Sequence, residues 1–163
     1  MMRIGILSDS HDNIWKLEEA IKHLATVDAV IHCGDLCAPF VVKRMAEGLD
    51  GIPIHIVWGN NDGDPLRISQ VASNYSNIQL HGETAKLILN GIKIAINHYP
   101  EIALDIADSG NFDLVCYGHD HTAHQEQRGS CLLLNPGELM GMKGRSTIAI
   151  YDTVTHKVEM IDL

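Results

Sequence analysis

The chain has 163 residues, of which 45% are hydrophobic and 20% are charged, a balance typical of a globular protein and unlike that of a disordered chain. Its formal net charge of −9 argues against general affinity for nucleic acids, which proteins bind through clustered Lys and Arg side chains. No apolar run approaches the length of a membrane span. The apolar segments are spread evenly, so we expect residues 1–163 to form a single domain.

The first apolar segment ends in polar residues that suit a ligand site. Residues 4–7 predict a buried strand, and Asp9 and His11 follow it before a helical pattern begins at Ile14. Residues two apart in an extended segment point to the same side, so Asp9 and His11 can converge on one ion. The pair alone also fits a helix-capping aspartate and a loop histidine, so its interpretation depends on the rest of the chain.

The next two predicted strands also end in oxygen-bearing side chains. Periodicity predicts helices and strands in alternation over these ranges: 14–25, 28–33, 38–49 and 54–58. Asp35 follows the first of these strands, and Asn60 follows the second. Alternating strands and helices favour parallel pairing with right-handed crossovers. Ligands of such sheets bind beyond the carboxyl ends of the strands.

The second half of the chain is predicted to be richer in strands. Residues 64–77 suit a short helix followed by a loop. Asn90-Gly91 joins apolar segments at 85–89 and 92–96, and this dipeptide suits the type I′ turn of a hairpin. A helix and five short strands are then expected, in this order: 101–109, 112–117, 125–128, 131–134, 146–151 and 158–161. We expect an α/β fold in which two sheets stack face to face with helices outside, a four-layer α-β-β-α sandwich.

Three histidines complete a set of polar side chains at strand ends. His98 follows the hairpin, and His119 and His121 follow the strand predicted over 112–117. The full set has seven members: Asp9, His11, Asp35, Asn60, His98, His119 and His121. Carboxylate, imidazole and amide groups suit borderline divalent ions such as Mn²⁺, Zn²⁺, Fe²⁺ or Ni²⁺. Seven ligands are too many for one such ion but suit two ions that share a carboxylate, an arrangement used in phosphoryl displacement.

Five motifs carry these residues along the chain: Asp9-x-His11, Gly34-Asp35, Gly59-Asn60-Asn61-Asp62, His98 and Gly118-His119-x-His121. In this order they resemble the motifs of the calcineurin-like metallophosphoesterases. The short chain, with Asn135-Pro136-Gly137 after the last motif, resembles the small YfcE-type branch of that family. The resemblance implies the α-β-β-α fold and hydrolysis of phosphate esters.

The resemblance also implies a role for each of the seven side chains. One divalent ion would be bound by three of them: Asp9, His11 and His121. A second ion would be bound by three others: Asn60, His98 and His119. Asp35 would bridge the two ions, and our candidates for catalytic residues are Asp35, Asn60 and His98. Mn²⁺ is the first expectation for both ions, with Ni²⁺, Zn²⁺ and Fe²⁺ as alternatives.

We therefore expect a phosphodiesterase that attacks small phosphodiesters with a metal-bridging hydroxide. Two divalent ions, two carboxylates and a hydroxide give a net charge of about +1, which matches a singly charged diester better than a dianionic monoester. Larger members of the family place a histidine after the ligand asparagine, where the chain has Asn61, whose amide cannot donate a proton at neutral pH. Glu138 is a second departure, because a small hydroxyl residue is more usual there.

Two other functions stay open, because a shared fold does not fix an activity. One is a phosphomonoesterase, and the other is a non-catalytic scaffold for protein partners, since a retromer subunit resembles this fold. We expect a small phosphodiester as the partner, with no membrane and no nucleic acid, and a homo-oligomer by resemblance only. The four cysteines form no C-x-x-C pair, and the apolar run after Arg3 is short for a signal peptide, so we expect a cytoplasmic protein.

Overall fold

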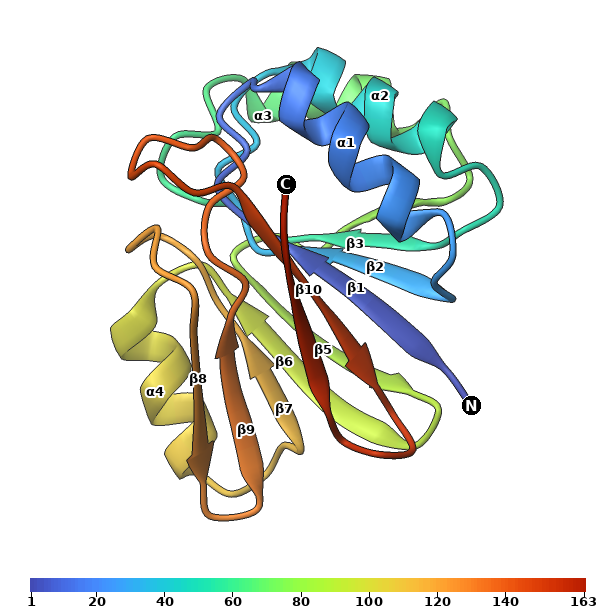
Figure 1. The fold of residues 1–163 in the computed structure, drawn as a ribbon. Coiled ribbons are helices and arrows are strands. Elements are labelled where there is room, and N and C mark those ends of the chain that lie inside the picture. Colours follow the sequence, from blue (N-terminus) through green and yellow to red (C-terminus); the bar gives the residue numbers. More distant parts are fainter.

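Two β-sheets lie face to face, with helices on both outer sides (Figure 1). The computed structural model describes residues 1–163. Its elements are, in chain order: β1 (Arg3–Leu7), α1 (Ile14–Leu24), β2 (Ala29–His32), α2 (Pro39–Gly48), β3 (Ile54–Ile56), α3 (Pro65–Ala72), β4 (Ile78–Leu80), β5 (Thr84–Leu89), β6 (Ile92–Asn97), α4 (Pro100–Asp108), β7 (Leu114–Cys116), β8 (His124–Arg128), β9 (Cys131–Asn135), β10 (Thr147–Asp152) and β11 (Val158–Asp162).

The first sheet has the strand order β11-β10-β1-β2-β3-β4, and the second has the order β5-β6-β7-β9-β8. Strands β1 to β4 pair in parallel, as the alternation of strands and helices predicts. In the second sheet, β6, β7 and β9 are parallel, and β5 and β8 pair with them in antiparallel. Helices α1 to α3 cover the first sheet and α4 covers the second, so the predicted four-layer α-β-β-α sandwich is confirmed (Figure 1).

Three apolar clusters hold the four layers together. One lies between α1 to α3 and the first sheet, the second between the two sheets, and the third between the second sheet and α4. Neighbouring residues of one strand serve different clusters, since side chains alternate across a strand: Ile6 packs between the sheets and Leu7 packs under the helices. Burying each such side chain stabilises the fold by about 1.5–3 kcal/mol.

Two local features refine the prediction from sequence. The hairpin of β5 and β6 is confirmed, and the left-handed φ of Asn90 (50°) and Gly91 (82°) is that of a type I′ turn. Strand β4, at Ile78–Leu80, follows the segment expected to be a short helix and a loop over residues 64–77, and the sequence did not predict it. Three residues are too few to show a strand period, and β4 is defined by its pairing with β3. None of the four helices has the length and apolar character needed to cross a membrane.

Candidate metal centre

The loops after β1, β2, β3, β6 and β7 bring the seven predicted ligands into one cluster. Parallel strands end at the same edge of a sheet. The corresponding edges of the two sheets lie side by side, and the backbone N–H of His119 donates from one sheet's loop to Asp9 Oδ2 in the other's (3.0 Å). Within the first sheet, Asp9 N donates to Gly34 O (3.1 Å) and His11 N donates to Asp35 O (3.0 Å). These bonds fix the polar loops against one another.

Side-chain contacts join all seven residues. Asp9 Oδ1 lies 3.3 Å from His121 Nε2 and 3.8 Å from His11 Nε2. Asp35 Oδ2 lies 3.4 Å from the Nε2 atoms of both His11 and His98. Each carboxylate therefore lies between two imidazoles, which is the arrangement expected of ligands that surround a cation.

The amide of Asn60 closes the other end of the cluster. Asn60 Oδ1 lies 3.1 Å from His98 Nε2 and 2.9 Å from His119 Nδ1. Asp9, Asp35 and His98 are buried, whereas Asn60 and His119 are exposed. The cluster thus runs from the interior to the surface, where a substrate has access to it.

Two sets of side chains can place one ligand atom each within 4.8 Å of all the others: Asp9, His11 and His121, and Asp9, Asp35 and His98. The sets share Asp9, whereas the family resemblance implies Asp35 as the shared ligand. Asp35 Oδ2 nevertheless lies at equal distance from a histidine of each set. Both carboxylates are therefore placed between the two halves of the cluster.

Two buried polar atoms of the cluster have no hydrogen-bond partner, Asp9 Oδ1 and His11 Nε2. A buried polar atom left unpaired costs roughly 1–3 kcal/mol, so native proteins rarely leave one without a function. A carboxylate oxygen and an imidazole nitrogen are both atom types that bind metal ions, and both atoms belong to the same candidate set. The residues present therefore fit a divalent ion.

The backbone is strained at the same place. Five of the seven predicted ligands have a left-handed φ, between 38° and 72°: Asp9, His11, Asp35, His119 and His121. A non-glycine residue in this region costs of order 1–3 kcal/mol and is found mostly at functional sites, where surrounding contacts hold it. The strain turns these side chains toward one centre.

Charges in the cluster favour a cation. Contact with the Asp35 carboxylate raises the pKa of His11 to about 9, and Asp9 adds to this effect. Although burial acts to raise the pKa of Asp35, contacts with His11 and His98 hold that pKa well below its usual value. Burial lowers the pKa of His98, but Asp35 outweighs burial and raises it. The negative charges of Asp9 and Asp35, which favour the protonated histidines, would also attract a metal ion.

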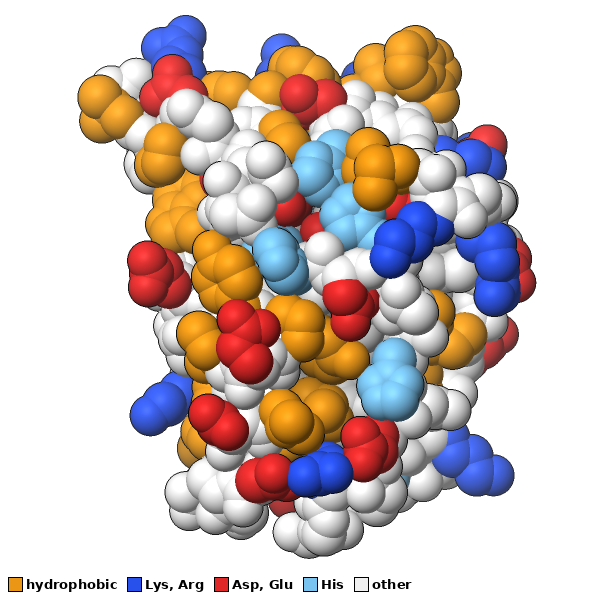
Figure 2. Space-filling view, turned by 90° about the vertical axis from the view of Figure 1, so that its left-hand side faces the viewer, with side chains coloured by type: hydrophobic (Ala, Val, Ile, Leu, Met, Phe, Trp, Pro, Cys, Tyr) orange, Lys and Arg blue, Asp and Glu red, His pale blue; other side chains and the backbone are white.

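Figure 2 shows histidines gathered around acidic side chains in a hollow on one face of the molecule. Residues 2–156 match the family model described as the calcineurin-like phosphoesterase superfamily domain. The chain belongs to this family. It is 34% identical over 157 residues to phosphodiesterase MJ0936 of Methanocaldococcus jannaschii, and the match covers 93% of each chain.

Proteins named as phosphoesterases are similar over most of the chain. The probable metallophosphoesterase YsnB of Bacillus subtilis is 32% identical over 151 residues, which are 90% of this chain and 80% of YsnB. The solved structure of an archaeal phosphodiesterase matches with a TM-score of 0.91 at 32% identity, over 99% of this chain and 100% of that one. YfcE of E. coli, at 17% identity and a TM-score of 0.68 over 98% of each chain, shares the fold.

Two residues whose roles the sequence left open hold Asp35 in this phosphoesterase. Asn61 donates from its backbone N to Asp35 Oδ1 and from its side-chain Nδ2 to Asp35 Oδ2, both at 2.8 Å. The Asp62 carboxylate accepts four backbone N–H groups of neighbouring loops: those of Asp35, Leu36, Cys37 and Gly59. A Cβ on Gly59 would lie 2.1 Å from Asp35 Oδ1, so only glycine fits there.

Glu138 is the buried partner of a predicted metal ligand. His121 Nδ1 donates to Glu138 Oε2 at 2.6 Å, and the backbone N–H of Lys143 donates to Glu138 Oε1. In the same way, His98 Nδ1 lies 2.8 Å from the carbonyl oxygen of Cys33. Such partners fix the ring so that its Nε2 atom faces the metal position. Sequence marked Glu138 as a departure from the family pattern but gave no sign of this contact.

The remaining histidines lie outside the cluster. His32 supports a nearby loop, since its Nε2 contacts Ser10 Oγ (3.0 Å) and its Nδ1 accepts from Gly34 N (3.2 Å). His55 pairs with His81 at 3.0 Å between Nδ1 and Nε2. Neither of these groups provides three converging ligand atoms, whereas the cluster of seven contains two sets of three.

Proposed function

We propose that this protein is a metal-dependent phosphodiesterase that hydrolyses small phosphodiesters. The observation that carries this proposal is the convergence of seven ligand side chains, with Asp9 Oδ1 and His11 Nε2 buried and unpaired among them. The similarity to phosphodiesterase MJ0936 and to the solved structure of an archaeal phosphodiesterase supports a diester as the substrate.

The family resemblance divides the ligands between two ions. Asp9, His11 and His121 would hold the first, and Asn60, His98 and His119 the second, with Asp35 shared between them. Divalent ions bound there would lower the pKa of water toward neutrality and offset negative charge on the phosphoryl oxygens. Mn²⁺ is the ion we propose, because carboxylate, imidazole and amide ligands suit it.

The chain's own residues prepare the site for this chemistry. Cys33 O and Glu138 fix the rings of His98 and His121, and Asn61 fixes both oxygens of Asp35. The amide of Asn61 orients a ligand but has no acidic proton to give to a leaving group. Esters with acidic leaving groups, which depart without a proton, should therefore react fastest.

The alternative functions fit the ligand set and the charge of the site less well. A scaffold that had lost catalysis would be expected to have lost ligands, whereas all seven positions carry ligand residues. A phosphomonoesterase is the second candidate, but a net charge of about +1 at the metal-loaded site would favour a singly charged diester. The four free cysteines fit the cytoplasm. A homo-oligomer stays a prediction from resemblance.

The test is hydrolysis of bis(p-nitrophenyl) phosphate beside p-nitrophenyl phosphate. Metal-free protein is supplied with Mn²⁺, Ni²⁺, Zn²⁺ or Mg²⁺, and Asp35→Asn is compared with Asp105→Asn, which alters an exposed carboxylate of α4. We expect metal-dependent cleavage of the diester, reduced at least about 100-fold in Asp35→Asn and unchanged in Asp105→Asn. Metal binding without cleavage under every condition would favour the scaffold, and faster cleavage of the monoester would favour a phosphomonoesterase.

A further inference from the structure

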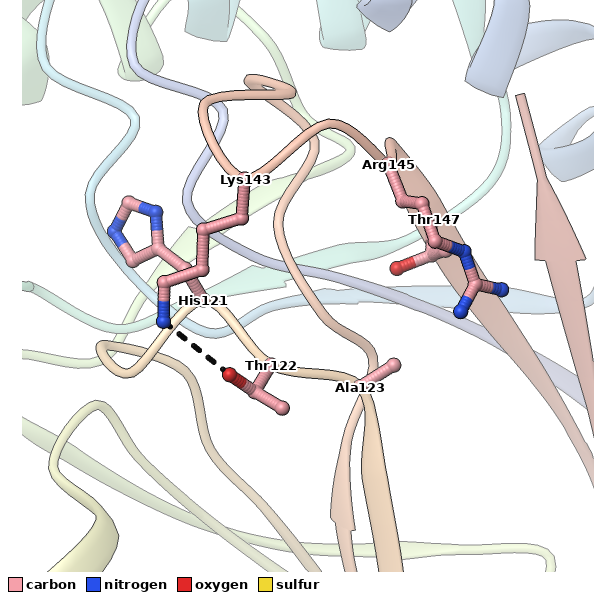
Figure 3. Close-up of a pocket in the computed structure, with 6 residues that line it drawn as sticks. All are labelled: His121, Thr122, Ala123, Lys143, Arg145 and Thr147. Carbon is pink, nitrogen blue, oxygen red and sulfur yellow. Dashed lines mark hydrogen bonds between the residues drawn. The ribbon is translucent and has the colours of Figure 1, made fainter.

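A pocket with a volume of about 190 Å³ adjoins the candidate metal centre beside His121 (Figure 3). Six residues line it: His121, Thr122, Ala123, Lys143, Arg145 and Thr147. Only Ala123 among them is apolar. Two of these side chains, Lys143 and Arg145, are cationic and none is acidic, so the pocket suits an anionic group.

Lys143 brings a positive charge that no carboxylate balances. Its Nζ donates to Asp120 O (2.5 Å) and to Thr122 Oγ1 (3.3 Å), and both acceptors are neutral. Lys143 takes part in none of the ion pairs of the structure, although the chain carries a net charge of −9. An ammonium group has three N–H donors, so one remains free for a ligand.

Arg145 adds a second donor on the other side of the pocket (Figure 3). Its Nε and Nη2 atoms bind the Asp162 carboxylate at 2.8–3.0 Å, and its Nη1 has no partner. This ion pair is exposed on both sides and therefore weak, so Arg145 can also turn toward an anion.

Glu138 connects the pocket with the metal centre. One of its carboxylate oxygens accepts from His121 Nδ1, and the other accepts from the backbone N–H of Lys143. Glu138 is 1% exposed, so this link lies in the interior, where hydrogen bonds to a charged group are strong. The backbone of Lys143 is thereby held at a fixed place relative to the predicted ligand His121.

We propose that this pocket binds a second phosphate group of the substrate. The inference rests on the proposed function: the preferred substrates are phosphodiesters in which one ester substituent carries a phosphate monoester. A phosphate dianion accepts hydrogen bonds on several oxygens and so fits the free donors of Lys143 and Arg145. Lys143 is then a specificity residue that contacts the substrate away from the reacting phosphorus.

The test uses two esters that differ in one group, p-nitrophenyl propyl phosphate and the same ester with a phosphate on the far end of the propyl chain. We expect kcat/KM to be about tenfold higher for the phosphorylated ester at low ionic strength, mostly through KM, and the preference to shrink with salt. An ester ending in a carboxylate separates recognition of phosphate from recognition of any anion, and equal preference for it would overturn the assignment to phosphate.

The matched variants are Lys143→Met, Lys143→Arg and Lys86→Met, the last altering an exposed lysine of β5. The ratio of kcat/KM for the phosphorylated ester to that for the plain ester should fall close to one in Lys143→Met. It should be mostly retained in Lys143→Arg and fully retained in Lys86→Met. Equal kcat/KM values for the two esters in the unaltered protein would contradict the inference. A preference that survives Lys143→Met would also contradict it. In both cases the protein would still be a phosphodiesterase.

Calorimetric titration gives a second readout that does not depend on activity. Propane-1,3-diol bisphosphate should bind the metal-loaded protein about tenfold more tightly than propyl phosphate, and Lys143→Met should remove the difference. If neither p-nitrophenyl ester is hydrolysed but this difference in affinity is found, the proposal of a phosphodiesterase is wrong and the proposal of a phosphate-binding pocket is supported. Equal affinities would overturn the pocket.

Discussion

Asp35 shows how single residues prepare the metal centre. Its carboxylate is 1% exposed, and a buried charge is tolerated only where its oxygens are paired. Asn61 supplies two of the hydrogen bonds, one from the backbone and one from the side chain. The side chain of Asn61 therefore orients a predicted ligand.

Asn61→Ala tests this role. The substitution removes the bond from Nδ2 to Asp35 Oδ2 and keeps the backbone bond, so Asp35 loses part of its orientation. We expect affinity for Mn²⁺ to fall about tenfold, the lower limit for loss of a group that supports a ligand. Calorimetric titration of metal-free protein measures it, with Asn111→Ala, an exposed asparagine, as the control. Equal affinity in both variants would show that the backbone bond is sufficient.

The seven ligand candidates could be predicted from sequence because each follows a strand closely and has a distinctive chemistry. Their supporting partners could not. Glu138 meets His121 across 17 positions of sequence, and Asp62 acts by accepting four backbone N–H groups. Such contacts arise from the folded loops, and no local pattern of residue types encodes them.

At the scale of elements, the accuracy of prediction followed the strength of the local signal. The helices had clear periods and Asn90-Gly91 had the chemistry of its turn, so α1, α2, α4 and the β5–β6 hairpin lie where expected. Strand β4 has no such signal, because its three residues are strand only through pairing with β3. Long-range pairing thus decides the elements that are too short to specify themselves.

Gly91→Ala tests the turn of the hairpin. Gly91 has a φ of 82°, and no atom lies within 4 Å of the position of an added Cβ, so the effect isolates backbone strain. We expect a loss of about 1 kcal/mol in the free energy of unfolding, or roughly 2–4 °C in Tm. Gly91→Asn is the matched control and should lose less, since asparagine tolerates this conformation. Equal losses for alanine and asparagine would assign the effect to something other than φ.

At the scale of the whole molecule, the centre depends on both sheets. The first sheet supplies Asp9, His11, Asp35 and Asn60, and the second supplies His98, His119 and His121. Only the stacking of the sheets brings these groups together, and the apolar layer between them contains buried residues of both. Conditions that weaken the fold should therefore also disperse the metal ligands.

Low pH is one such condition, and buried His55 is a specific reason why acid should destabilise the fold. His55 is 5% exposed in β3, and burial lowers its pKa to about 4, with a smaller contribution from His81 beside it. The unfolded chain has a histidine pKa of about 6.5, so below that pH the unfolded state binds a proton that the folded state excludes. His55 therefore does not lower the free energy of unfolding above about pH 6.5, and it lowers that free energy progressively as the pH falls toward 4.

His55→Gln should remove this part of the pH dependence. At pH 5, a folded pKa of 4 and an unfolded pKa of 6.5 correspond to about 2 kcal/mol, so the loss of unfolding free energy between pH 8 and pH 5 should be smaller by that amount in the variant. Urea unfolding in the presence of EDTA measures it without a contribution from bound metal, and His23→Gln, on the exposed side of α1, is the control. If His55→Gln loses as much stability between pH 8 and pH 5 as the unaltered protein, then His55 takes up its proton in the folded state and the acid sensitivity of the fold has another origin.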